Sequence, residues 1–150
     1  MKKIMVLLYV DSVLAKVAGL SVAAAVATFL RIPFSATSEV WVLLAVLLPI
    51  TLVIVSFLWE AVAIALQGKD TLKSVKLKFR EWEETQEDHR SMIFHFFLAT
   101  LAVGVVGGPL DALAVFFASA VIAAREDIRA VRAFAVVLPF LAQNNRSARL

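Results

Sequence analysis

An uncharged stretch at 40–59, VWVLLAVLLPITLVIVSFLW, constrains the fold of this chain more than any other feature. A helix of about 20 apolar residues matches the roughly 30 Å hydrocarbon core of a bilayer. The rest of the chain agrees with this environment, because 61% of its 150 residues are hydrophobic, against about 45–50% in soluble domains. We therefore predict an all-α integral membrane bundle, folded as a single domain over 1–150.

Two further regions are apolar enough to cross a membrane. The first crossing is expected at 12–30, after a short N-terminal extension, and the second at 40–60. The third region, 92–124, is too long for one crossing and contains the sequence GVVGGPLDAL. Glycine ends helices and proline suits the first helical position, so Gly107, Gly108 and Pro109 indicate a tight hairpin with arms at 92–106 and 109–124. The alternative is one kinked helix over the whole region.

Charge placement agrees with four crossings. Basic residues gather before the first crossing, between the second and third, and after the fourth, whereas the opposite side has Arg31 alone. Cytoplasmic segments of membrane proteins are enriched in Lys and Arg. We therefore expect both termini and the long central loop to be cytoplasmic.

The central loop, 69–90, is predicted to be an amphipathic helix on the cytoplasmic membrane surface. Apolar residues recur at helical spacing at Leu72, Val75, Phe79 and Trp82, while the charges are sorted into a basic first half and an acidic second half. The basic half suits anionic lipid headgroups. The acidic half calls for a basic partner, either the arginines that follow the fourth crossing or a neighbouring copy. The alternative is a solvated helix whose charges have no particular role.

The apolar stretch that follows these arginines is too short to cross a membrane. We predict a C-terminal interfacial helix at 126–142, although 133–142 can also be read as re-entrant. Together the two amphipathic segments supply a set of docking or headgroup-binding residues: Lys73, Lys76, Lys78, Arg80, Trp82, Arg125, Arg129 and Arg132.

Small residues recur every four positions on two of the predicted crossings. Such faces let membrane helices approach closely, and they form seams within a chain or between subunits. The residues are Ala15, Gly19, Ala23 and Ala27 on the first crossing, and Thr100, Gly104 and Gly108 on the third.

Ionisable residues within membrane spans are candidates for function. Four stand out here, Lys16, Glu60, His95 and Asp111. Lys16 and Glu60 lie near the cytoplasmic ends of their spans, and Asp111 suits the first turn of a helix. A continuous helix would align Glu84, Asp88 and His95 as metal ligands, but no common ligand spacing supports this, so we expect neither metal nor cofactor.

The chain has no cysteine and no phosphate-binding or nucleophile motif, so we expect it not to be an enzyme. Nucleic-acid binding is not expected, because acidic residues follow the basic ones at once. The favoured function is a structural or accessory subunit of an oligomeric membrane assembly, either a homo-oligomer or a complex with other membrane subunits. The alternatives are an oligomeric ion channel or small transporter, and a structural protein of a membrane-containing particle or filament.

Overall fold

A computed structural model describes residues 2–31 and 39–147, with the side chains of 87–90 and 141–147 left outside the description. Within this part of the chain there are five helices and no strand. In chain order they are α1 (Lys2–Arg31), α2 (Glu39–Gln67), α3 (Lys69–Glu84), α4 (Glu87–Gly107) and α5 (Pro109–Ser147).

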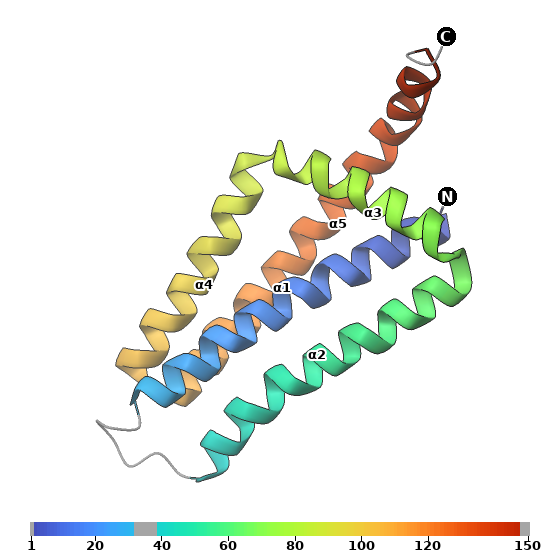
Figure 1. The fold of residues 1–150 in the computed structure, drawn as a ribbon. Coiled ribbons are helices and arrows are strands. Elements are labelled where there is room, and N and C mark those ends of the chain that lie inside the picture. The colour runs from blue at the N-terminus through green and yellow to red at the C-terminus, as the bar shows by residue number, and fades with distance from the viewer. Residues whose placement is uncertain (1, 32–38, 148–150) are drawn as a thin grey trace.

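Four long helices form an antiparallel bundle, and α3 lies across one of its ends (Figure 1). The N-terminus, α3 and the last part of α5 lie at that end, which we call the α3 end; the turn between α4 and α5 lies at the opposite end. α1 is the central helix, since it packs against α2, α4 and α5. α1 and α2 are long and apolar enough to cross a membrane.

The predicted hairpin at 92–124 is present. α4 ends at Gly107, α5 begins at Pro109, and the two helices pack against each other. Gly108 between them has a φ of 111°, a conformation that a residue with a side chain rarely adopts. The single kinked helix is therefore wrong.

Two predicted boundaries differ from the structure. The charged helix expected over 69–90 stops at Glu84, where Thr85 donates its hydroxyl to the carbonyl oxygen of Trp82 at 2.6 Å, and α4 begins at Glu87. A side chain that bonds to the preceding turn in this way competes with the helical ladder. The chain thus turns from α3 down into the bundle five residues earlier than expected for the third crossing.

The second difference concerns α5, which is one helix through Ser147 rather than a crossing followed by a separate helix at 126–142. Charge begins at Arg125, but hydropathy alone does not end a helix. The buried side of α5 keeps its three- and four-residue spacing across this point. Its members are Ala112, Phe116, Ser119, Ala123, Asp127, Val131 and Phe134.

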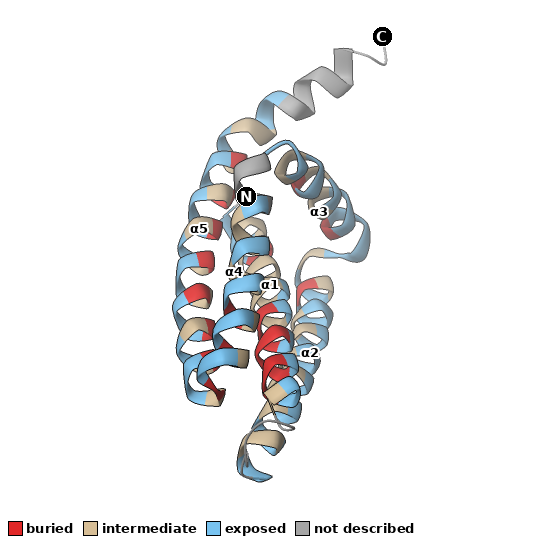
Figure 2. Ribbon diagram, turned by 90° about the vertical axis from the view of Figure 1, so that its left-hand side faces the viewer, coloured by how far each residue is buried: buried red, intermediate tan, exposed pale blue. Residues whose placement is uncertain are grey.

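Buried residues lie on the facing sides of the helices and exposed residues cover the outside of the bundle (Figure 2). Many of the exposed residues are large and apolar. On α1 the buried residues of the middle turns include Ser21, Ala23, Ala27 and Thr28. A Cβ on Gly104 of α4 would lie 2.6 Å from the Cβ of Ala27, so α1 and α4 touch almost backbone to backbone. By contrast, no residue is buried in the most apolar 18-residue stretch of α2.

The apolar stripe of α3 packs on the protein itself. Leu72 is 2% exposed and packs with Leu7 and Ala63, while Phe79 is 5% exposed and packs with Phe134. The predicted apolar stripe therefore forms part of the protein core. The first turns of α1 and the far part of α5 extend beyond the middle of the bundle and provide an apolar surface for α3.

Candidate functional site

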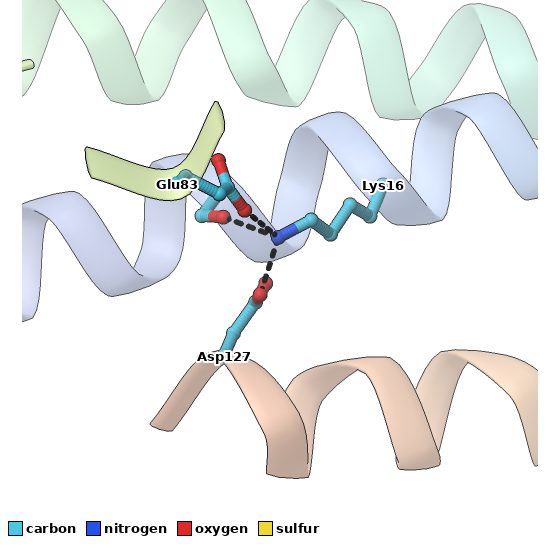
Figure 3. Close-up of polar contacts among 4 residues, drawn as sticks. Lys16, Glu83 and Asp127 are labelled. Carbon is cyan, nitrogen blue, oxygen red and sulfur yellow. Dashed lines mark hydrogen bonds and ion pairs between the residues drawn. The ribbon is translucent and has the colours of Figure 1, made fainter. Parts of the chain in front are cut away.

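Lys16 of α1 is the centre of an ionic cluster that joins three helices (Figure 3). Its Nζ donates to Ser12 Oγ at 2.9 Å and to Glu83 Oε1 of α3 at 2.8 Å, and it also pairs with Asp127 Oδ1 of α5. A lysine ammonium has three N–H donors, and three acceptors surround this one. The cluster therefore ties α1, α3 and α5 together near the α3 end.

The carboxylate of Asp127 is fully buried, at 0% exposure. Its place on the inward stripe of α5, four residues after Ala123 and four before Val131, directs it at α1. A buried charge is tolerated only when it is paired. The Lys16 ammonium fulfils that requirement, so these two residues depend on each other.

A second ionic cluster lies beside the first. Lys76 of α3 donates to Asp11 Oδ1 of α1 at 2.9 Å and lies 3.6 Å from Glu60 Oε1 of α2. These side chains are partly exposed, so each bond contributes little by itself. The two clusters link α3 to α1, α2 and α5, and α3 also packs on α4.

An open cavity of about 600 Å³ lies next to both clusters. α1, α3 and α4 line it, with charged and polar residues from α1 and α3 and apolar residues from all three helices. The charged and polar lining consists of Asp11, Ser12, Lys16, Lys73, Lys76, Arg80 and Glu83. A second, apolar groove of about 210 Å³ lies between α1, α2 and α5 and is bordered by Trp41, Ala45 and Phe117.

The four candidate intramembrane residues do not come together in the structure. Lys16 and Glu60 belong to the two ionic clusters just described. His95 is exposed on α4, with Nδ1 2.6 Å from the carbonyl oxygen of Ser91 on its own helix. Asp111 is exposed in the first turn of α5, at the opposite end of the bundle. Within one chain they line no common path.

The small-residue faces divide into a packed part and an open part. Ala23, Ala27, Thr100, Gly104 and Gly108 are buried where α1, α4 and α5 meet. The remaining two, Ala15 and Gly19, are exposed and line the 600 Å³ cavity.

Arg31, the one basic residue expected on the far side, contacts the end of α4. Its Nη1 donates to the carbonyl oxygens of Val105 and Val106, and Gly108 packs against its guanidinium. Carbonyl groups in the last turn of a helix lack intrahelical partners and carry partial negative charge. Arg31 therefore caps the C-terminal end of α4 beside the turn to α5.

The expected docking residues have several environments. Lys73 and Arg80 are exposed and line the cavity, whereas Lys76 is paired with carboxylates. Trp82 is half-buried, with its ring centroid 6.0 Å from that of Phe79. The three arginines of α5 are exposed, and Arg129 Nη1 pairs with Glu126 of the same helix at 2.7 Å.

The predicted pairing of the acidic half of α3 with the α5 arginines is not present among the described side chains. Glu83 pairs with Lys16 instead. Glu84 and His95 do not share a helix stripe either, because the helix is interrupted at Thr85 and Gln86 and they lie on α3 and α4. Over the described residues no group of three or more His, Asp or Glu side chains is placed to hold a metal ion.

Glu83 and Asp127 were missed by the sequence reasoning. Asp127 carried a detectable signal, because it falls in step with Ala123, Val131 and Phe134 on the apolar side of its helix. Glu83 carried none, since it sits among acidic neighbours that look alike in sequence.

Comparison with known proteins found no relative of this chain. No protein-family model matches the chain, and neither a curated protein nor a solved structure is similar to it.

Proposed function

We propose that this protein is a non-enzymatic integral membrane protein with four crossings that serves as a structural or accessory subunit of an oligomeric assembly. The observation that carries the proposal is the distribution of apolar side chains over the bundle. Large apolar residues are exposed along the outside of α2, α4 and α5, while the residues buried in the middle of α1 are mostly alanine, serine and threonine. Water would not tolerate so large an apolar surface, but lipid does.

The crossings in this proposal are the parts of α1, α2, α4 and α5 that lie side by side. Charged side chains concentrate at the α3 end, in α3 itself and in the part of α5 that follows Arg125. That end is the cytoplasmic one under the positive-inside rule. α3 then lies at the level of the cytoplasmic headgroups, covering the end of the bundle.

The groove between α2 and α5 is the proposed contact with another subunit. α2 packs along one side on α1 and leaves the rest of its apolar surface uncovered. The groove beside it holds about 210 Å³ and has small residues in its floor, including Ala24 and Ala25. Side chains from a second helix fit into such a surface, and close packing is the main attraction between helices in lipid.

Mass measurement in mild detergent tests this proposal. We expect the purified chain to require detergent and to have a protein mass above that of one chain. Ala45→Phe fills the groove and should shift the complex toward the single chain. Val46→Phe is the matched control, because Val46 is exposed beside the groove without lining it.

Two results would overturn the proposal. A chain that stays soluble and monodisperse without detergent would reject the membrane assignment. A wild-type chain that is strictly monomeric in several detergents and in nanodiscs, with no co-purifying protein, would reject the assembly.

A further inference from the structure

The cavity between α1, α3 and α4 joins a charged rim to an apolar interior. On α3 it is bordered by Lys73, Lys76, Leu77 and Arg80, which share one face at steps of three and four. α1 and α4 also line the cavity, and Asp11, Ser12 and Lys16 of α1 stand there among mainly apolar residues. The apolar lining residues of these two helices are Leu8, Ala15, Gly19, Leu20, Ile93 and Phe97. A ligand that fills this space must itself have a charged part and an apolar part.

The charges of the rim indicate that the charged part of the ligand is an anion. The carboxylates of Asp11 and Glu83 are already bonded to Lys76 and Lys16. Lys73 and Arg80 are the remaining cations, and no ion pair joins either one to another described side chain. They are seven residues apart, which places them about 10 Å from each other along the helix.

Leu77 and Gly19 mark the apolar part of the cavity. Leu77 is 59% exposed although it lies between two cations on α3, and it is not on the stripe that packs into the core. On the facing helix, a Cβ added to Gly19 would meet no atom within 4 Å. Together they leave an open apolar space that begins beside the cations and continues toward the middle of the bundle.

We propose that this cavity binds one anionic phospholipid, with its phosphate between Lys73 and Arg80 and an acyl chain along Leu77 and Gly19. This rests on the proposed membrane location, which places the cavity at the depth of the headgroups. Basic pockets between membrane helices bind anionic lipid headgroups on the cytoplasmic side. The bound lipid would hold α3 against α1 and α4.

Native mass spectrometry of the full chain, released from detergent, tests the site. The probes are phosphatidylglycerol and phosphatidylcholine with identical acyl chains. We expect the wild type to favour phosphatidylglycerol by about thirty-fold, the effect of two headgroup-level cations. Lys73→Gln with Arg80→Gln should abolish this preference. Lys3→Gln with Lys69→Gln removes the same charge at the same end but outside the cavity, and should preserve it.

A second variant tests the acyl-chain path. Gly19→Leu should weaken phosphatidylglycerol binding at least ten-fold while leaving the thermal midpoint in lipid-free detergent at or above the wild-type value, because the backbone at Gly19 has space for a side chain. Glycerol phosphate separates a lipid site from a free-phosphate site. It should fail to displace the lipid at millimolar concentration.

Equal binding of the two lipids by the wild type, or an unchanged preference in the Lys73 and Arg80 double variant, would overturn the lipid site. Displacement by glycerol phosphate would also overturn it. If the chain inserts and assembles but shows no lipid preference, the lipid site is rejected and the proposed function stands. If the chain needs no detergent, both are rejected.

Discussion

Lys16 illustrates what a single residue reveals only in three dimensions. From the sequence, a lysine near a span end is expected to extend toward the headgroups along its aliphatic stem. In the structure it turns inward instead, because Glu83 and Asp127 lie 67 and 111 positions further along the chain and meet it there. The sequence showed that Lys16 needed explaining, but its partners depend on how α3 and α5 pack.

The mutual dependence of Lys16 and Asp127 leads to a prediction at the residue scale. Lys16→Met leaves the buried carboxylate without its ammonium and should lower the free energy of unfolding in detergent by roughly 3–5 kcal/mol. Lys16→Met combined with Asp127→Leu should cost less than the sum of the two single changes. Denaturant titration followed by tryptophan fluorescence measures all three variants.

Lys3→Met provides the control, because Lys3 is exposed near the start of α1. An additive double variant, or a Lys16 variant as stable as the Lys3 variant, would contradict the role of the cluster in holding the helices together.

At the scale of the helix, α3 shows which features the spacing of apolar residues predicts and which it does not. The stripe Leu72, Val75, Phe79 and Trp82 was recognisable from its spacing. The surface that the stripe covers was not recognisable, because a membrane and a protein core select the same apolar residues. Continuous helicity through Arg125 was missed for a related reason: loss of hydropathy was read as an end of the helix.

The burial of this stripe predicts how α3 is retained. Phe79→Ala removes a ring that packs edge-on against Phe134, with centroids 5.2 Å apart, and should lower stability by roughly 3–5 kcal/mol. Leu77→Ala should cost far less, since Leu77 is mostly exposed. Thermal unfolding in detergent compares the two, and hydrogen exchange should locate the loosening in α3. An equal loss of stability from both changes would contradict the packing of the α3 stripe on protein and favour packing on lipid.

At the scale of the molecule, apolar segment lengths and the glycine and proline positions predicted the hairpin at Gly108 and the common end for the N-terminus, α3 and the far part of α5. The number of helices was wrong, because α5 is one helix where two were expected. The positions of the ionic clusters and of the cavity were not predictable, because they depend on which faces of helices distant in sequence come together. The channel alternative gains nothing from this arrangement, since its candidate residues lie apart.

Cysteine labelling tests the topology of the four proposed crossings. The chain has no native cysteine, so single replacements report cleanly. Ser74→Cys in α3 and Ser147→Cys should react with an impermeant maleimide from one side of the membrane, and Ser35→Cys from the other. Reaction of all three from the same side would mean that α2 does not cross the membrane, and would exclude the four crossings.

The central position of α1 has a consequence for how the protein is made. During synthesis α1 leaves the ribosome before α2, α4 and α5, which all pack on it. Each of these three helices therefore emerges when its surface on α1 already exists, whereas Phe79 of α3 and Lys16 of α1 meet their partners on α5 only after α5 is made. Biogenesis can proceed in the order of translation, with the α4 and α5 pair added last as one unit.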